Sequence, residues 1–420
     1  MRILLINKFL YGRGGAEHST LTTGRLLEAR GHEVIYWGMA HPQNPSYPHE
    51  DCFTPHVDYD DLPGLRPKIR AAVDILWSRR ARRQMERLMK RVRPDVVHMN
   101  NIAHQLSPSF LPVLKRYGIP LVMTLRDYKL VCPSYAMLSG DGLCDRCAGG
   151  RYYHCLLRRC TKGSYAKSLV NTLEMYFHHQ WMGVYDLIDA FISPSRFLIT
   201  RMKAMGFGRR IRWLSNFVEV ERLEPGYESD GRTLVYFGRL SREKGLLTLL
   251  DAVRGLDVRL RIVGDGPLRG ELESRVRSGH LRNVCLPGHH SGPALHEIIR
   301  SATAVVLPSE WYENNPRCLL EGFALGKGAI ASRIGGIGEL VTPGHTGWLF
   351  DAGNVRALRT AIQDMLANPD KAARMGRNAR AYVERFHGPD RHYRRLLAIY
   401  RAAGRRGPSA TSQEPMIAPT

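Results

Sequence analysis

Residues 233–245, TLVYFGRLSREKG, decide the fold. The run from Thr233 to Gly238 is apolar and β-branched, which is typical of a strand buried on both faces. Two cations, Arg239 and Lys244, follow on the loop and the first turn of the next helical segment. Ligands of open α/β sheets bind at the carboxyl ends of the strands, beside helix N-termini. We therefore predict that both cations face the phosphates of a ligand; two solvated surface side chains are the alternative.

Short strands and helical segments alternate along the chain in two series, one before Asn216 and one after it. This is the rhythm of parallel sheets covered by helices on both sides, and it predicts an α/β fold with two Rossmann-like domains. A long helical pattern is expected from about Lys68 to Pro94, and a polar, disordered tail over 405–420. The expected strands are Ile3–Ile6, Val34–Trp37, Val96–Met99, Leu121–Leu125, Phe191–Ser193, Thr233–Gly238, Arg259–Gly264, Val284–Leu286, Ala304–Leu307 and Gly328–Ala331.

The composition is strongly basic. The 420 residues include 61 Lys and Arg against 39 Asp and Glu, a formal net charge of +22. Such a charge favours polyanionic partners: nucleic acid, an anionic membrane surface or a phosphorylated substrate. No apolar run reaches the ~18 to 20 residues of a membrane helix, and the N-terminus lacks the apolar core of a signal peptide. The sequence therefore predicts a cytoplasmic protein.

A second chemical segment is LPSEWYENNPRCLLEGFALG, residues 307–326. Glu313 comes just before Pro316, a residue typical of a first helical turn, and Glu321 falls about two turns deeper. A carboxylate on an apolar helix needs partners, and ribose hydroxyls supply them in dinucleotide sites. The alternative is a helix cap followed by an exposed glutamate. The turn IVGDGP, residues 262–267, contains Gly264 and is a weaker signal, since many α/β loops look alike.

In this order and separation, these segments resemble the retaining glycosyltransferases of family 4, the group 1 transferases with a GT-B fold. GRGGAEH at 12–18 and DVVHMN at 95–100 are similar to the first loop and a later strand of that family. The resemblance covers residues 1 to about 400. It implies two Rossmann-like domains facing across a cleft: an acceptor domain at 1–215 and a nucleotide-sugar-binding domain at 216–388, with a last helix, 389–404, packing back on the first.

The resemblance also implies roles for individual residues. Arg239 and Lys244 would hold the donor diphosphate, Glu313 the donor sugar and Glu321 the ribose, while Gly14 and Gly15 would turn backbone N–H groups toward the phosphates. The implied catalytic set is Glu313, Arg239, Lys244, Arg126 and Asp127. The implied donor-binding set is Gly14, Gly15, Gly238, Arg239, Lys244, Gly264, Asn314, Asn315, Pro316 and Glu321.

The implied reaction moves a hexose from a UDP- or GDP-sugar, with retention, to a glycan or polyprenyl-linked acceptor in cell-surface polysaccharide biosynthesis. Fixed cations at the leaving diphosphate replace a divalent metal, so no cofactor is required for catalysis. One departure is Arg126, which stands where many relatives have a histidine, and arginine is not a proton acceptor at neutral pH. A catalytically silent GT-B scaffold is therefore an alternative. A nucleic-acid-binding protein is another, suggested by charge alone; no binding motif supports it, and we expect no nucleic-acid partner.

Five cysteines cluster between 132 and 160. The pair Cys144 and Cys147, followed by Cys155 and Cys160, is compatible with a structural zinc ion, although the second spacing is wide. Free or transiently oxidised thiols and an iron–sulfur cluster are the alternatives. This Cys-rich insert follows Arg126 and Asp127, so we expect it to border the acceptor cleft.

The segment 66–93 forms a basic stripe, with eleven Lys or Arg against two acidic residues and apolar residues at helical spacing. Such a helix can lie peripherally on an anionic membrane surface. It can equally pack on its own sheet with solvated arginines, and the sequence leaves both interpretations open.

Overall fold

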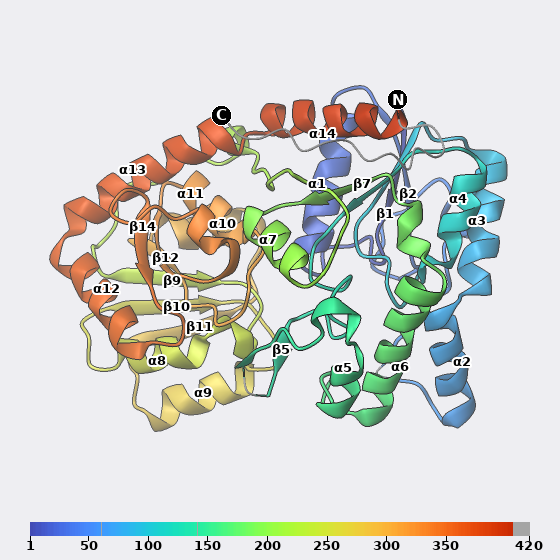
Figure 1. The fold of residues 1–420 in the computed structure, drawn as a ribbon. Coiled ribbons are helices and arrows are strands. Elements are labelled where there is room, and N and C mark those ends of the chain that lie inside the picture. The colour runs from blue at the N-terminus through green and yellow to red at the C-terminus, as the bar shows by residue number, and fades with distance from the viewer. Residues whose placement is uncertain (60, 141, 406–420) are drawn as a thin grey trace, which may run out of the picture.

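The computed structural model describes residues 1–59, 61–140 and 142–405, which form two α/β lobes (Figure 1). Each lobe is built on a six-stranded parallel sheet, as the strand rhythm predicts. The N-terminal sheet runs β2 (Glu33–Trp37), β1 (Arg2–Ile6), β3 (Val96–Met99), β4 (Leu121–Thr124), β7 (Ala190–Ser193) and β8 (Ile211–Trp213). The C-terminal sheet runs β11 (Val284–Gly288), β10 (Arg259–Val263), β9 (Thr233–Phe237), β12 (Ala304–Leu307), β13 (Gly328–Ser332) and β14 (Gly347–Phe350).

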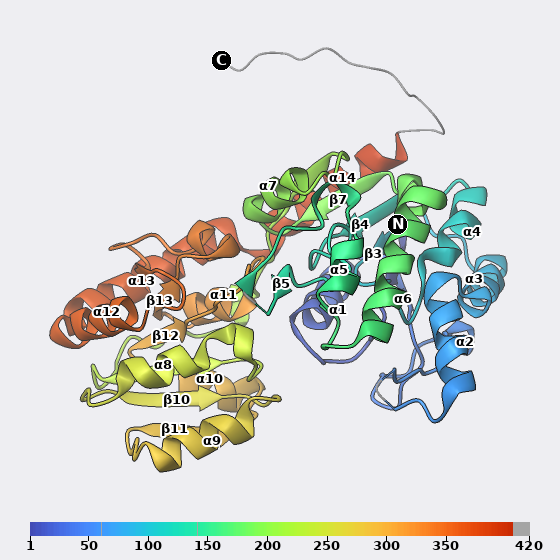
Figure 2. The same cartoon turned by 60° about the horizontal axis from the view of Figure 1, so that its bottom comes forward.

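Helices cover both faces of each sheet (Figures 1 and 2). The N-terminal lobe carries α1 (Gly15–Glu28), α2 (Leu65–Leu76), α3 (Arg79–Arg91), α4 (Leu111–Arg116), α5 (Tyr153–Leu157), α6 (Tyr165–Met175) and α7 (Arg196–Ala204). The C-terminal lobe carries α8 (Leu246–Val253), α9 (Arg269–Ser278), α10 (Gly292–Arg300), α11 (Arg317–Ala324), α12 (Val355–Ala367) and α13 (Pro369–Phe386). The Cys-rich insert also holds the short pair β5 (Leu138–Ser139) and β6 (Gly142–Leu143).

The long helix expected from about Lys68 to Pro94 is wrong, because the structure has two helices there. Trp77 ends α2 in an extended conformation. Ser78 then caps α3 by accepting a hydrogen bond from the N–H of Ala81, and a capped start of this kind favours a new helix over a continued one. The basic stripe is thus divided between two helices with different surroundings.

The last described helix, α14 (Pro389–Gly404), crosses the molecule and lies on the N-terminal sheet (Figure 1). Its residues Leu396 and Tyr400 belong to one apolar cluster with Ile3 and Val122 of that sheet. The Tyr400 hydroxyl also hydrogen-bonds the buried His98 of β3 at 2.7 Å. The end of the described chain is therefore part of the core of the first lobe.

Over the described part of the chain, no helix combines the length and apolar character needed to cross a bilayer. The predicted disordered tail, 405–420, lies outside the described residues from 406 onward.

Candidate functional site

The loops that follow β9 and β10 meet at the carboxyl edge of the C-terminal sheet. A Cβ on Gly264 would lie 1.9 Å from the carbonyl oxygen of Gly238, so only glycine permits this approach. Arg239 follows directly and is exposed, and Lys244 ends a short 3-10 turn, Arg242–Lys244. The sequence-predicted cations thus lie at the strand ends where an anionic ligand would bind.

Lys244 is paired with Glu313. Its Nζ lies 2.5 Å from Oε1 of Glu313, which also accepts a hydrogen bond from Ser309 at 2.6 Å. Burial raises the pKa of the Glu313 carboxyl, but the ammonium of Lys244 and these hydrogen bonds outweigh it, and the net pKa is lowered. Two residues that are 69 positions apart in sequence therefore form one charged unit. Without a ligand, the positive charge of Lys244 and the negative charge of Glu313 neutralise each other.

Glu321 lies on the second turn of α11 and is also paired. Arg317 Nη2 donates to its Oε1 at 3.0 Å. Pro316 is the N-cap residue of α11, one position before the first turn where the sequence placed it. Arg317 is one residue that sequence reasoning missed, although its spacing of four from Glu321 was a readable signal.

Across the cleft, the loop after β1 leads into α1. Gly14 is the N-cap residue and Gly15 the first helical residue. A Cβ on Gly15 would meet no atom within 4 Å, so the space before this helix start is open. His18 faces Arg317 of the other lobe, and burial, followed by that guanidinium, lowers its pKa to about 4. The first loop and α11 therefore face each other.

Arg126 connects the two lobes. It donates to Oδ1 of Asn100 through Nε and to Oδ1 of Asn216 through Nη1, both at 2.8 Å. Burial, then repulsion from Arg317, lowers its pKa to about 10, and the guanidinium stays charged at neutral pH. The adjacent Asp127 has its pKa raised by burial and accepts a hydrogen bond from the Lys129 N–H at 2.9 Å.

Asn314 uses its side chain between the lobes, whereas Asn315 binds Asn216 at their junction. Asn314 accepts from Ser195 at 2.7 Å and donates to the Leu125 carbonyl at 3.1 Å. Asn315 Oδ1 accepts from the backbone N–H of Asn216 at 3.2 Å. The contacts of Asn314 hold the two lobes together; the predicted donor contacts of both residues stay a prediction.

Tyr135 of the Cys-rich insert is a second residue that sequence reasoning missed. The residue is 49% exposed, and its backbone adopts a left-handed conformation with φ of 59°. Burial raises its pKa, as does Asp127 of the N-terminal lobe, while Arg239 of the C-terminal lobe opposes the rise. No sequence motif marks this residue, which enters the site only because the insert reaches the cleft.

The cysteines of the insert lie near one another, but they do not form the arrangement that the zinc prediction requires. Cys155 and Cys160 hydrogen-bond to each other, and this contact, against the effect of burial, lowers the pKa of Cys155 to about 6. Cys147 has its pKa raised to about 12 by burial. Among the described residues, no three His, Cys, Asp or Glu side chains are placed to hold a metal ion. The predicted site at Cys144, Cys147, Cys155 and Cys160 is therefore not supported, and we assign no step to a metal.

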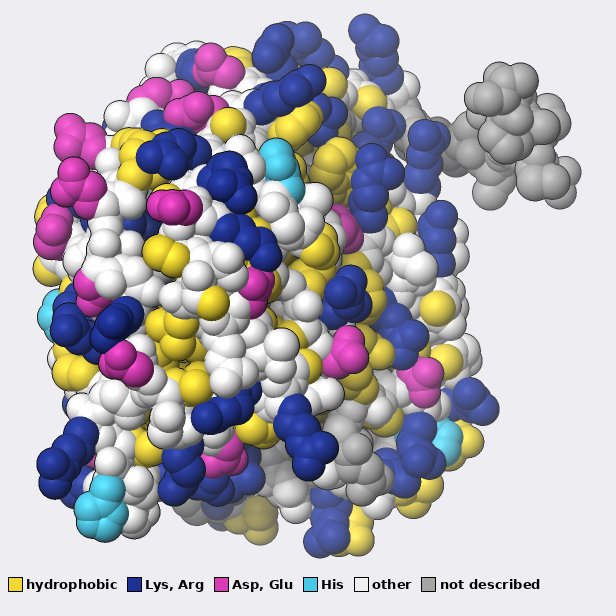
Figure 3. Space-filling model, turned by 90° about the vertical axis from the view of Figure 1, so that its left-hand side faces the viewer, with side chains coloured by type: hydrophobic (Ala, Val, Ile, Leu, Met, Phe, Trp, Pro, Cys, Tyr) yellow, Lys and Arg dark blue, Asp and Glu magenta, His cyan; other side chains and the backbone are white. Residues whose placement is uncertain are grey.

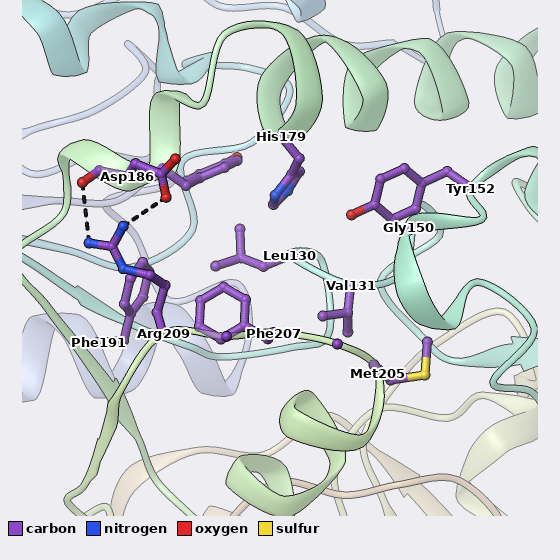
Figure 4. A pocket seen from close by; sticks show the side chains of 13 residues that line it. Leu130, Val131, Gly150, Tyr152, His179, Asp186, Phe191, Met205, Phe207 and Arg209 are labelled. Atoms are coloured by element: carbon purple, nitrogen blue, oxygen red, sulfur yellow. Dashed lines mark hydrogen bonds and ion pairs between the residues drawn. The ribbon is translucent and has the colours of Figure 1, made fainter. Parts of the chain in front are cut away.

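A separate cavity of about 300 Å³ lies beside the insert (Figure 4). His179 and Tyr152 reach into it, and an ion pair between Arg209 and Asp186 borders it. None of the predicted donor residues lines this cavity. It is distinct from the site at the strand ends.

Two family models match the chain and meet near the junction of the two sheets. Glycosyltransferase Family 4 matches residues 13–222, half of the chain, and Glycosyl transferases group 1 matches residues 219–382. The chain belongs to glycosyltransferase family 4. The paired Lys244 and Glu313 and the Glu321 helix of this family member lie within the second match.

Two curated relatives show the range of similar proteins. A D-rhamnosyltransferase of Pseudomonas aeruginosa is 36% identical over 164 residues, 38% of this chain and 43% of its own. A GDP-mannose-dependent alpha-mannosyltransferase of Mycobacterium tuberculosis is 28% identical over 280 residues, 64% of each chain. This family 4 glycosyltransferase therefore matches about half of the length of such curated relatives.

Solved structures confirm the GT-B fold of this family 4 glycosyltransferase. Sucrose-phosphate synthase from Thermosynechococcus elongatus superposes with a TM-score of 0.72 at 19% identity, covering 95% of this chain and 98% of that one. Anabaena HepE in complex with UDP-glucose superposes with a TM-score of 0.62 at 16% identity, with the same coverage. At such identities the likeness concerns the fold alone.

Proposed function

We propose that this family 4 glycosyltransferase transfers a sugar, with retention, from a nucleotide-sugar donor to a glycan or polyprenyl-linked acceptor of a cell-surface polysaccharide. The observation that carries the proposal is the Lys244–Glu313 pair at the carboxyl edge of the C-terminal sheet, opposite the open N-terminus of α1. We expect the cations, the Glu313 carboxylate and the first-turn N–H groups of α1 to face one donor in the cleft. The cytoplasmic location expected from the sequence stays a prediction.

Departure of a nucleoside diphosphate leaves negative charge on phosphate and oxocarbenium character on the sugar. Arg239 and Lys244 would stabilise the first charge, and the first-turn N–H groups of α1 would add to it. When the donor phosphate engages Lys244, the Glu313 carboxylate becomes free to accept from sugar hydroxyls. Glu321, held by Arg317, would accept from the ribose. Attack from the face that the diphosphate leaves would retain the configuration, with the leaving phosphate taking the acceptor proton.

The donor class draws support from similar proteins. One relative is named as dependent on GDP-mannose, and a structural neighbour was solved with UDP-glucose. A titration panel of UDP-, GDP- and ADP-sugars against the purified protein, followed by assay of donor hydrolysis, tests the proposal. Binding of one base class together with slow hydrolysis supports it. Failure of all three classes to bind refutes it.

The silent scaffold remains a second candidate because of Arg126. This side chain is held by Asn100 and Asn216 and so acts as a link between lobes. Donor binding without hydrolysis or transfer to any glycan acceptor would favour the scaffold.

A further inference from the structure

Large apolar side chains are exposed along two neighbouring helices. On α6, the exposed residues Tyr165, Leu169 and Leu173 recur every four positions. Trp181, which ends the π-helical segment η4 (Tyr176–Trp181) that continues α6, is 68% exposed. On α2 the same spacing recurs, and Leu65 is 72% exposed. We call this surface the α2/α6 face, made of Leu65, Ile69, Val73, Tyr165, Leu169, Leu173 and Trp181.

The two stripes form one surface because the helices lie side by side (Figures 1 and 2). His178 of η4 hydrogen-bonds the carbonyl of Leu76 at 2.6 Å, and the rings of Trp77 and Phe177 lie 6.1 Å apart. The C-terminal ends of α2 and η4 therefore meet. Helix α5 packs against α6 on its other side and adds the exposed Leu157.

These apolar residues are not needed for the internal packing of the lobe. Helix α2 buries only Ala71 and Ile75, on its opposite side. By contrast, α3 turns its apolar stripe, with Met85 and Leu88, into the core and leaves arginines outside. In the basic stripe, α3 therefore packs on its own lobe with its arginines in solvent, which is one of the two interpretations that the sequence left open. Helix α2, in contrast, leaves its apolar residues uncovered. A contiguous exposed apolar surface of this kind marks an interaction site.

The charge around the α2/α6 face is predominantly positive. Residues 151–173 contain five Lys or Arg and no Asp or Glu, and residues 61–76 contain three Lys or Arg against Asp61 and Asp74. The end of the molecule that the C-terminal lobe occupies differs, since Figure 3 shows Lys and Arg interspersed there with Asp and Glu. Apolar side chains ringed by cations complement a bilayer with anionic headgroups, where the apolar groups enter the acyl boundary and the cations remain at the phosphates.

We propose that the α2/α6 face is a membrane-docking surface that seats the N-terminal lobe on anionic lipid. Helices α2 and α6 would lie in the interfacial plane, with Ile69, Leu169 and Trp181 as anchors. Docking itself requires no donor chemistry. Docking would bring a lipid-linked acceptor to the cleft, which we expect the Cys-rich insert with α5 to border. This purpose of docking rests on the proposed function.

The test is flotation of the full chain with vesicles of equimolar phosphatidylglycerol and phosphatidylcholine, without donor. The wild type should bind at low salt and be only partly released at high salt, because salt screens the charges and leaves the apolar contribution. The triple variant I69S/L169S/W181S should bind at least tenfold more weakly. Removing cations from the face, as in K68Q/R70Q/R159Q, should weaken binding by about fivefold for each cation that contacts lipid.

The matched control is R79S/R80S/R83S, which removes the same charge from α3. This control should bind vesicles almost as tightly as the wild type does. If it loses as much vesicle binding as the α2/α6 variants, the attraction depends on net charge alone and the proposal is overturned. Brominated acyl chains should quench tryptophan fluorescence in the wild type and do so less in Trp181→Phe. Equal quenching in both proteins would also overturn the proposal. A wild type that does not bind vesicles but self-associates, and loses self-association in I69S/L169S/W181S, would overturn it in favour of a contact between copies of the chain. Donor binding measured on the same variants separates this outcome from failure of the proposed function.

Discussion

Arg317 Nη2 lies 3.0 Å from Oε1 of Glu321, so the carboxylate expected to meet ribose is held in place before any ligand arrives. Both side chains are mostly buried, at 13% and 25% exposure, and the pair spans one turn of α11. A charged hydrogen bond of this kind fixes a rotamer. Arg317 is thus a positioning residue, and its partner is offered to the cleft in one orientation.

Glu321→Ala should raise the donor KM by about tenfold to a hundredfold and change kcat less. A ribose contact is remote from the reacting sugar and is made equally in ground and transition states. Steady-state kinetics with varied donor measures the split. The control is Glu384→Ala, which removes an exposed surface carboxylate paired with Arg380 on α13. A fall in kcat with unchanged KM would contradict the ribose assignment.

Lys244→Ala should lower kcat by about 10²–10³, because it removes a fixed cation at the leaving diphosphate. It should also destabilise the fold, since it leaves the buried Glu313 carboxylate unpaired, at a cost of roughly 3 kcal/mol. Chemical denaturation measures the second effect, and Lys244→Ala/Glu313→Gln should recover much of the stability without recovering turnover. Arg242→Ala is the control, an exposed cation on the same turn. Full turnover by a folded Lys244→Ala protein would overturn the assignment.

Asn314→Ala should favour a more open arrangement of the lobes. It removes the hydrogen bond from Ser195 and the one to the Leu125 carbonyl, each contributing about 1 kcal/mol. Small-angle scattering should show a larger radius of gyration. Asn354→Ala removes only the N-cap of α12, and it should cost about 1 kcal/mol of stability without changing that radius. Identical scattering from wild type and Asn314→Ala would refute the interlobe role.

His98 should make stability dependent on pH. It is buried between Tyr400 and Thr124, and burial, followed by repulsion from Arg126, lowers its pKa to about 3. Between that value and the ordinary pKa of about 6.5, the unfolded chain binds a proton that the folded chain does not. Stability therefore rises with pH across this window, and each unit of acidification below about 6.5 costs up to about 1.4 kcal/mol.

The measurement is urea denaturation of the wild type and of His98→Gln from pH 7 down to pH 5. Other buried histidines also contribute to the wild-type slope, so the difference between the two proteins carries the prediction. The variant should show the smaller loss on acidification. Parallel slopes would show that His98 is not responsible.

The strands were readable from sequence because parallel strands buried on both faces appear as continuous apolar runs. Val96–Met99 and Ala304–Leu307 have the predicted bounds. Besides the short pair β5 and β6, the sequence missed two strands at sheet edges, Ile211–Trp213 and Gly347–Phe350. Ile211–Trp213 has only three residues, two of them partly exposed, which leaves too weak a pattern to separate it from a loop.

The site was readable only in part. Arg239, Lys244 and Glu321 follow from local rules about strand ends and helix turns. The contact between Lys244 and Glu313 joins two loops that only the sheet brings together, and no spacing in the sequence encodes it. The same holds for Tyr135, which reaches the cleft through the shape of an insert. The cysteine spacing suggested a metal, but no metal-holding group is found among the described residues, and Cys155 hydrogen-bonds Cys160.

The position of α14 has a consequence for synthesis on the ribosome. The face of the first sheet that holds Ile3 and Val122 is covered by Leu27 of α1 together with residues of α14, from 389 onward. While the chain emerges, the part of that apolar face that α14 covers stays open to water and to chaperones, although every strand of its sheet has already been made. The C-terminal lobe is contiguous in sequence from β9 to α13. Its core does not wait for a distant segment, so this lobe can fold first. The lobe translated first is therefore completed last, and its final step couples release from the ribosome to the joining of the two lobes.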